Sequence, residues 1–298
     1  MKKYILKIVI FFAIFALLDA FYGKACEYLR GKAQGGSTYD DKYVCDSTTQ
    51  DILIFGSSRA RHQYVPTIIQ DSLNMTCYNC GAIGMGIIFH YGRMRVISQR
   101  YIPKVILYDV LPVLDEMERD DNTIFINPLR PHYDINGIDS IFNKIDPTEK
   151  YKMHSNTYKY HSNLFTYFSD YRNSSHTILG YNPQQGVIQK GEKIEEKTDY
   201  KVDSLKLYYL ERFIKEYKDK TKIIFLASPR YQFEKSGNAF DPLISLCKKY
   251  DIPFLNYYND KRFIYDEQYY KDATHFNQLG AETYTRMIIG DIRKIFDK

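Results

Sequence analysis

From Asp51 onward, short apolar runs alternate with stretches that have the residue spacing of amphipathic helices. Apolar runs of this length separated by helices are typical of parallel strands that are covered on both faces. This alternation predicts an α/β fold, a three-layer α/β/α sandwich around a five-stranded parallel sheet. The strand candidates are 52–55, 76–81, 104–110, 222–228 and 253–258. The helix candidates are 66–73, 87–101, 202–218, 242–250 and 278–296.

Residues 115–200 interrupt this alternation. The stretch is rich in Tyr, Asn, Asp and His, has no strong strand pattern, and contains one helical pattern over 149–171. A segment of this length without strands inside a domain is commonly a lid or a wall of a binding site. The alternative is a surface insertion without such a role. We therefore expect one domain over 51–298 that carries a Tyr-rich insertion at about 115–200.

Residues 8–18 form an uninterrupted apolar run with three lysines before it and Asp19 after it. A run of this length with a basic start is typical of a signal peptide. The longer segment 4–22 is instead long enough to serve as an uncleaved membrane anchor. Both interpretations predict an extracytoplasmic protein, periplasmic or at the cell surface.

The triplet Gly23-Lys24-Ala25 has small residues at the positions that signal cleavage requires, so cleavage before Cys26 is one alternative. Retention of the segment as an anchor is the other. We therefore expect a signal peptide or anchor over 1–25, followed by a linker over 26–50.

The composition excludes several classes of protein. With 44% apolar and 26% charged residues, the chain is globular rather than disordered or collagen-like. Basic residues exceed acidic residues by only 41 − 36 = 5, without a long basic run, so no nucleic-acid partner is expected. The 29 Tyr and 18 Phe imply that many aromatic rings lie at the surface, which suits a polar ligand such as a sugar.

The five cysteines are too few for a disulfide scaffold. In an exported chain, Cys26 with Cys45 and Cys77 with Cys80 are two alternative pairs for oxidation. At least Cys77 and Cys247 are expected to be buried as small apolar side chains. Because only one C-x-x-C is present and no second pair complements it, no zinc site is predicted.

Polar residues at two distant places carry the strongest chemical signal. The first predicted strand ends in the block GSSR at 56–59. A serine just past a strand, entering a helix, presents its hydroxyl beside backbone N–H groups that stabilise an oxyanion. Near the other end of the chain, Asp272 precedes His275 by three residues. This spacing lets the carboxylate fix the tautomer of the imidazole, whose Nε2 then takes the proton of a serine hydroxyl.

These blocks resemble those of the SGNH (GDSL-like) hydrolase superfamily. FGSSR at 55–59 matches the first block, whose usual GDS reads GSS here, and the resemblance implies Ser58 as the nucleophile. DATHFNQLGAETYT at 272–285 is similar to the last block over nearly its full length. It implies Asp272 and His275 as the other members of a catalytic triad, and a flavodoxin-like sandwich of the SGNH-hydrolase type as the fold.

The middle blocks are less regular. NCGAIG at 79–84 resembles the second block, whose glycine donates a backbone N–H to the oxyanion. Gly84 fits that position best, Gly81 is the alternative, and the N–H of Ser58 is the other expected donor. The third block normally supplies an Asn side chain as a further donor, but the third strand here ends at Asp109 without an Asn. An ionised carboxylate accepts hydrogen bonds and does not replace that donor.

Two arginines are candidates for binding substrate. Arg59 follows the nucleophile, and Arg230 follows the fourth strand. We expect both to line the cleft at the strand ends and to bind a carboxylate or an anionic sugar. His62 has no carboxylate near it in the sequence, so we interpret it as a supporting or structural residue.

Together these features predict an exported serine esterase or acyltransferase that acts on O-acyl esters, for example O-acetyl esters, of a surface carbohydrate. The GSSR opening also resembles membrane-associated members of the superfamily that handle acyl groups on cell-surface polysaccharides. The alternative is a non-catalytic module of the same fold that binds polysaccharide or an assembly partner, and the absent Asn supports it. The expected partners are an acylated carbohydrate or another ester and, through an uncleaved N-terminal segment, the membrane. No metal or other cofactor is expected.

Overall fold

The structure is a computed structural model that describes residues 1–118, 126–161, 163–189, 200–232 and 237–297. The chain forms two compact units, and each unit is assembled from two separate segments. Met1–Ser47 and Ile126–His176 form the first, which we call the helical unit. Thr48–Phe125 and Thr177–Lys298 form the second, which we call the sheet unit.

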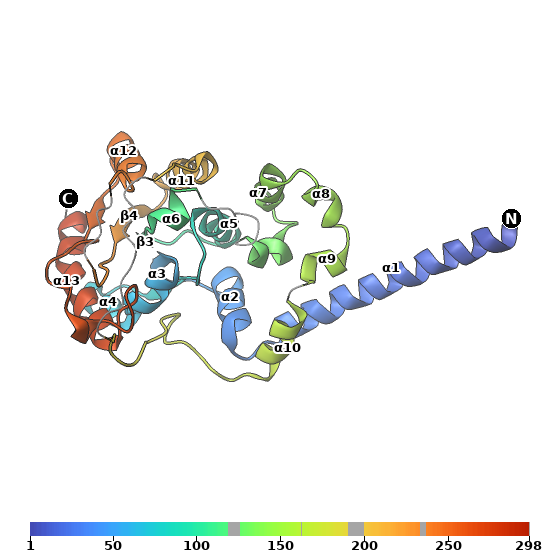
Figure 1. Ribbon diagram of the computed structural model, residues 1–298, viewed down its shortest axis with the longest axis horizontal. Helices are drawn as coiled ribbons and strands as arrows, with labels where there is room; N and C mark the ends of the chain where they lie inside the picture. Colours follow the sequence, from blue (N-terminus) through green and yellow to red (C-terminus); the bar gives the residue numbers. More distant parts are fainter. Residues whose placement is uncertain (119–125, 162, 190–199, 233–236, 298) are drawn as a thin grey trace. The chain divides into compact units, whose positions relative to one another are not determined.

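The sheet unit contains a five-stranded parallel sheet in the order β2-β1-β3-β4-β5. This order is that of flavodoxin-like doubly wound folds, in which ligands bind beyond the carboxyl ends of the strands. Four of the five strands fall within the runs that the sequence predicts, and β1 extends one residue beyond its run, so the predicted α/β/α sandwich is confirmed (Figure 1). The strands are β1 (Ile52–Gly56), β2 (Cys77–Asn79), β3 (Val105–Asp109), β4 (Lys222–Ala227) and β5 (Phe254–Asn256).

The helices of the sheet unit cover both faces of the sheet (Figure 1). Two predicted helices, 66–73 and 278–296, agree with the structure at both ends. The helix predicted over 87–101 ends earlier, at Ile97. The helices are α3 (Ser58–Gln63), α4 (Pro66–Leu73), α5 (Ile87–Ile97), α6 (Pro112–Asp115), α11 (Ser204–Tyr217), α12 (Asp241–Tyr250), η2 (Glu267–Tyr269) and α13 (Gln278–Phe296).

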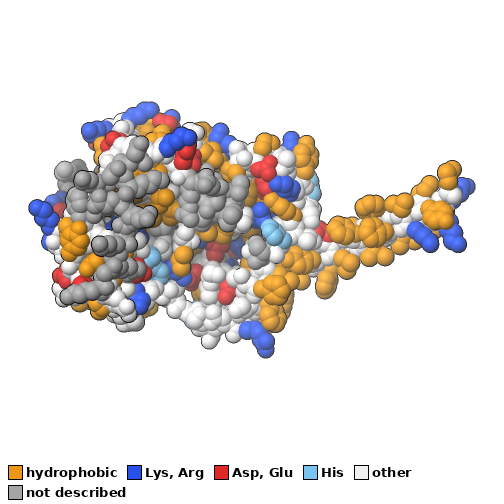
Figure 2. Space-filling view, in the orientation of Figure 1, with side chains coloured by type: hydrophobic (Ala, Val, Ile, Leu, Met, Phe, Trp, Pro, Cys, Tyr) orange, Lys and Arg blue, Asp and Glu red, His pale blue; other side chains and the backbone are white. Residues whose placement is uncertain are grey.

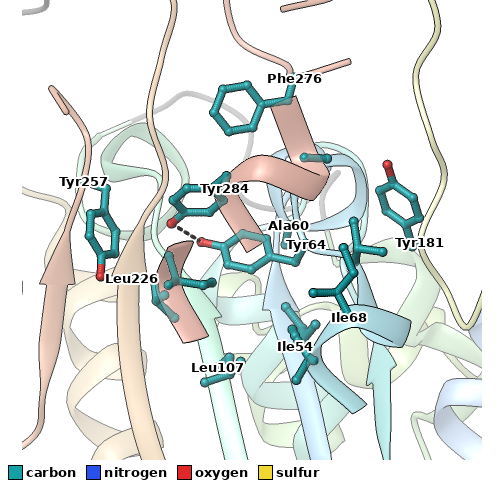
Figure 3. Packing of buried hydrophobic residues seen from close by; sticks show 14 of the residues in the cluster. Ile54, Ala60, Tyr64, Ile68, Leu107, Tyr181, Leu226, Tyr257, Phe276 and Tyr284 are labelled. Atoms are coloured by element: carbon teal, nitrogen blue, oxygen red, sulfur yellow. Dashed lines mark hydrogen bonds between the residues drawn. The ribbon is translucent and has the colours of Figure 1, made fainter. Parts of the chain in front are cut away.

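Alternate residues of each central strand point to opposite faces of the sheet. Ile54 and Leu107 belong to one buried cluster that includes Tyr64 after α3 and Tyr284 of α13, whose hydroxyls lie 3.3 Å apart (Figure 3). The next residue, Phe55, faces the other way and packs against Phe213 of α11. Burial on both faces explains why these strands are continuous apolar runs, each buried side chain contributing about 1.5–3 kcal/mol.

The helical unit corrects two expectations. Residues 26–50 are not a linker, because they complete α1 and form α2, where the backbone N–H of Thr38 donates to the Asp170 carboxylate at 2.8 Å. The helical pattern over 149–171 is divided among three short helices, the second of which begins where Ser155 accepts from the Tyr158 N–H. The helices are α1 (Lys2–Gly31), α2 (Gly36–Asp46), η1 (Asn127–His132), α7 (Ile138–Ile145), α8 (Glu149–Lys152), α9 (Asn156–Tyr160) and α10 (Leu164–Arg172).

The predicted insertion at 115–200 is shared between the two units. Its residues 126–176 belong to the helical unit, whereas 177–189 belong to the sheet unit. Residues 190–199 lie outside the described part of the chain. All five cysteines are free and buried, so neither proposed pair is bonded and the expected burial of Cys77 and Cys247 is confirmed.

Candidate active site

A glycine controls the turn at the end of β1. Gly56 has φ +133°, and a Cβ on it would lie 2.5 Å from the Asp109 carbonyl oxygen. Only glycine adopts this φ without strain. Because glycine also has no side chain, the end of β3 can lie close to the turn. Ser57 then caps α3 by accepting a hydrogen bond from the Arg59 N–H, and Ser58 becomes the first residue of that helix.

The second part of the site is the loop between η2 and α13. The Asp272 carboxylate accepts backbone hydrogen bonds from Thr274 and His275, both at 2.9 Å, and one from the Thr274 hydroxyl at 3.0 Å. These bonds hold the carboxylate beside the imidazole, and both of its oxygens lie 3.0 Å from His275 Nδ1. The short spacing Asp-x-x-His thus forms a turn whose two side chains face one another.

Ser58 and His275 meet at the edge of the sheet. Ser58 Oγ lies 2.8 Å from His275 Nε2, although the residues are 217 positions apart in the chain. Because Nδ1 faces a carboxylate, we assign its proton to Nδ1, which leaves the Nε2 lone pair to accept from the serine hydroxyl. His275 and Asp272 keep 24% and 39% of their side chains exposed, so a substrate has access to the group.

The charge on Asp272 supports this arrangement. Burial alone would raise the pKa of the Asp272 carboxyl, but the hydrogen bonds from His275 and from the Thr274 backbone lower this pKa well below its ordinary value. The carboxylate is therefore ionised over the whole range in which an imidazole titrates. An ionised carboxylate at Nδ1 holds the ring in one tautomer and stabilises an imidazolium.

The two backbone N–H groups that the sequence suggests as oxyanion donors are those of Ser58 and Gly84. Among the residues that the structure describes, neither the Ser58 N–H nor the Gly84 N–H has a hydrogen-bond acceptor. Gly84 has φ +73° and lies in the loop whose Ala82 N–H bonds to the Gly56 carbonyl at 2.9 Å. The alternative donor, Gly81, is already used, because its N–H donates to Asn79 Oδ1 at 2.9 Å. The role of Gly84 as an oxyanion donor therefore stays a prediction.

Arg59 does not line the cleft, contrary to the expectation from the sequence. Its side chain is 1% exposed. The guanidinium donates to the backbone oxygen and the hydroxyl of Ser228, and its Nε lies 3.9 Å from Asp109 Oδ2. A buried cation needs such partners, since an unpaired charge would be strongly unfavourable in this environment. Arg59 therefore anchors the turn that carries Ser58 instead of meeting a ligand.

Asp109, at the position of the absent Asn, is also buried and bonded to other parts of the protein. Its Oδ1 accepts from the Tyr64 hydroxyl at 2.7 Å and from the Ser228 N–H at 2.9 Å, and the residue is fully buried. It joins the ends of β3 and β4. The Asp109 carboxylate thus links neighbouring strand ends. A carboxylate accepts hydrogen bonds and does not donate one to an oxyanion.

Arg230 lies against an aromatic side chain. Its Nη1 donates to the Tyr258 hydroxyl at 2.8 Å, and the guanidinium is 5.8 Å from the centre of that ring. The residue is half-buried. Its expected role in binding an anionic group remains a prediction.

His62 lies beside His275, which the sequence does not indicate. Its ring packs edge to face against the His275 ring, with centroids 5.5 Å apart. Its Nδ1 lies 2.7 Å from the Asn182 carbonyl oxygen, so this nitrogen carries the proton. Burial lowers the pKa of His62, and the neighbouring His275 and Arg61 lower it further. A neutral ring therefore supports one side of His275, and its position one helical turn after Ser58 is the only sequence signal for this.

The end of the insertion forms part of the surroundings of the site. The Leu179 carbonyl accepts from the Asn79 N–H at 2.8 Å, which places Leu179 beside the end of β2, and the Asn182 N–H donates to the Arg61 carbonyl at 3.1 Å. A Cβ on Gly180 would lie 1.9 Å from the Asn79 carbonyl oxygen, so glycine is required for this approach. Asn182 then reaches His62, as described above.

One group of possible metal ligands occurs in the described part of the chain, and it lies in the helical unit. Ligand atoms of Asp41, Cys45 and His132 are all within 4.8 Å of one another. Arg30 places its guanidinium 2.9 Å from His132 Nε2. Because the Arg30 guanidinium already lies against Nε2 of the His132 ring, we assign no metal to the group.

Comparison with known proteins gives limited similarity. No family model matches the chain, and no curated protein matches it. Among solved structures, a protein from Lactobacillus plantarum is 13% identical with a TM-score of 0.44, covering 83% of this chain and 98% of that one. The lipase/acylhydrolase from Enterococcus faecalis is 13% identical with a TM-score of 0.41, covering 83% of this chain and 96% of that one. Since both TM-scores lie below 0.5, the function has to be argued from the site itself.

Proposed function

We propose that the chain is a serine hydrolase or acyltransferase of the SGNH type that acts on ester bonds. The supporting observation is the continuous line of contacts from Ser58 Oγ through His275 to Asp272, with distances of 2.8 Å and 3.0 Å. A hydroxyl bonded to an imidazole that is itself oriented by a carboxylate is an activated nucleophile.

In the proposed reaction, Ser58 Oγ attacks the ester carbonyl carbon while His275 Nε2 takes the hydroxyl proton. Asp272 stabilises the imidazolium that results, and the N–H groups of Ser58 and Gly84 donate to the oxyanion. The intermediate collapses, the C–O bond to the alcohol breaks, and His275 returns the proton to the departing oxygen. The acyl group is now on Ser58. Water or a sugar hydroxyl, deprotonated by His275, then attacks the acyl carbon and releases an acid or a new ester.

The oxyanion is held by fewer donors than is usual for the superfamily that the sequence resembles. Removing one such donor typically lowers turnover by a factor of about 10²–10³. Because Asp109 is engaged by Tyr64 and Ser228, it does not compensate for this loss. We therefore expect a slow enzyme, suited to a substrate that is held at high local concentration.

The substrate class that we propose is an O-acyl ester, for example an O-acetyl ester, of a surface carbohydrate. An apolar N-terminal helix, long enough to cross a membrane by length and composition, supports a location outside the cytoplasm. Arg230 is the proposed contact for an anionic group of such a substrate.

The test is covalent labelling with a fluorophosphonate probe, which reacts with activated serines. The wild-type chain and Ser57→Ala should be labelled, whereas Ser58→Ala should not, with circular dichroism showing that both variants fold. Ser57 is the matched control because it is the adjacent serine and serves only as a helix cap. Absence of labelling in the wild type would favour the non-catalytic binding module, and labelling of Ser58→Ala would exclude Ser58 as the nucleophile.

A further inference from the structure

The first part of α1 exposes apolar side chains on all sides. Every residue from Tyr4 to Leu18 is exposed, and Figure 2 shows hydrophobic side chains around this part of the helix. A helix that is apolar all round is stable only inside a protein or a membrane. Fifteen residues of α-helix extend about 22 Å, at about 1.5 Å per residue.

The last part of α1 is instead built into the helical unit. The Asp19 carboxylate accepts from the Ser155 hydroxyl at 2.9 Å and from the N–H groups of Asn156 at 2.8 Å and Thr157 at 2.7 Å. It thereby caps α9, whose first N–H groups have no partner within the helix. Gly23 packs directly on Asn156, since a Cβ there would lie 2.5 Å from that side chain.

The same face of α1 continues into a small apolar core. The Tyr22 hydroxyl donates to the Tyr160 carbonyl at 3.2 Å, and Cys26 is fully buried in a cluster with Tyr160 and Tyr167. Tyr22 and Gly23 lie three and four residues after Asp19, and Cys26 lies four and three residues after them, so the four residues share one helix face. Cleavage before Cys26 would divide this face, leaving the Asn156 and Thr157 N–H groups of α9 without their acceptor and the core without Tyr22.

We propose that α1 is retained as a membrane anchor and that the helical unit rests on the bilayer surface through an aromatic collar. The collar consists of Phe21, Tyr28, Phe165 and Phe168. The partner is the lipid bilayer, and this proposal does not depend on the proposed enzymatic function.

The length of the exposed segment requires the unit to approach the lipid. The hydrocarbon core of a bilayer is about 30 Å thick, which exceeds the apolar segment that ends at Asp19 by about 8 Å. Such a mismatch is accommodated when flanking residues enter the interface. Asp19 is fixed within the helical unit. When Asp19 enters the headgroup region, the surface of that unit therefore contacts the lipid headgroups as well.

The collar has the side chains that suit this position. Phe21 is 73% exposed, Phe165 is 87% exposed and Phe168 is 51% exposed. Tyr28 is 58% exposed, and its ring lies 6.4 Å from that of Tyr171, so α10 is beside α1. Tyrosine is enriched where a membrane protein passes from hydrocarbon to water, and phenylalanine is typical of the lipid-facing side of helices that lie in this interface.

Retention of α1 is tested by intact-mass measurement and N-terminal sequencing of the full chain, purified from the membranes of a bacterial host that exports it. We expect a chain that still contains α1 and stays in the membrane pellet after alkaline carbonate extraction. A mature chain that begins at Cys26, or release of the protein by carbonate, would overturn the proposal.

The collar is tested by fluorescence, because the chain contains no tryptophan. Phe165→Trp introduces a single fluorophore at an exposed position in the full chain, reconstituted in phosphatidylcholine–phosphatidylglycerol vesicles. Quenching by lipids with a doxyl group near the headgroup should exceed quenching by lipids labelled near the end of the acyl chain. The same variant in vesicles without doxyl lipid gives the unquenched reference. Quenching of Phe165→Trp that is equal for the two labelled lipids, or absent with both, would overturn the collar.

Discussion

Arg59 and Asp109 form an ion pair without access to water: Nε lies 3.9 Å from Oδ2, and the side chains are 1% and 0% exposed. Arg59 directly follows Ser58, and Asp109 is the last residue of β3. Both also bond to Ser228, which follows β4. The pair therefore connects the turn that carries Ser58 to the ends of β3 and β4. It thereby fixes the position of the first turn of α3.

We expect Asp109→Asn to lower the free energy of unfolding by about 3–5 kcal/mol, because it leaves the Arg59 guanidinium buried without a counter-charge. The control is Asp219→Asn, which removes the exposed pair with Lys218 and should cost less than about 1 kcal/mol. Urea unfolding at neutral pH measures both variants. A cost for Asp109→Asn as small as that of the control would contradict the anchoring role.

Asp272→Asn should lower kcat by about 10⁴-fold with little change in KM. An amide at this position donates to His275 Nδ1 and moves the ring proton to Nε2, which then no longer accepts from Ser58. Thr274→Val, which removes one hydrogen bond to the same carboxylate, should cost less than about tenfold in kcat. Steady-state hydrolysis of 4-nitrophenyl acetate gives these values. If both variants lose activity equally, the loop as a whole rather than the carboxylate controls the rate.

His62 should make the fold less stable in mild acid. Burial lowers its pKa below the ordinary 6.5, so the unfolded chain binds more protons than the folded one as the pH falls through that value, and stability decreases. The lowered pKa of Asp272 acts in a separate range, because its stabilisation is complete above about pH 4 and is lost only below that.

His62→Gln should therefore reduce the difference in urea midpoint between pH 7.5 and pH 5.5. A part of the difference should remain, since burial also lowers the pKa of His90. An unchanged pH dependence in His62→Gln would show that this ring does not carry the effect.

Gly56→Ala should destabilise the sheet unit by about 1–3 kcal/mol, because its φ of +133° is strained for alanine. The new Cβ would also press on the Asp109 carbonyl, so we expect a fall in fluorophosphonate labelling of Ser58. Gly290→Ala in α13 has nothing within 4 Å of the new Cβ and should instead stabilise by about 0.5–1 kcal/mol. Thermal unfolding of the two variants in parallel would refute this difference if both shifted in the same direction.

The parts of the structure that sequence predicts best are those governed by local pattern. The sheet follows from apolar runs such as 52–55, because strands buried on both faces leave a continuous signal. The turn at Asp272 and His275 is equally local, since three residues separate the two side chains. Block resemblance then associates this turn with Ser58, and the structure brings the two together at 2.8 Å.

The remaining features depend on contacts that no local pattern records. An arginine beside a nucleophile suggests a ligand contact, and only the position of Asp109, fifty residues later, shows that Arg59 belongs to the interior. The bond from His62 to the Asn182 carbonyl involves a main-chain atom, which residue type does not reveal. Likewise, the apolar pattern of 8–18 indicates a membrane-directed segment, but it gives no sign that Asp19 caps a helix that begins at Asn156.

The separation of 217 positions between Ser58 and His275 has a consequence for biosynthesis. While the ribosome is still adding the insertion, the serine has been made but its imidazole does not yet exist. A nascent or truncated chain that lacks the last loop therefore lacks the imidazole that, in the proposed mechanism, activates Ser58. Under that mechanism the site is complete only after translation has supplied residues 272–275.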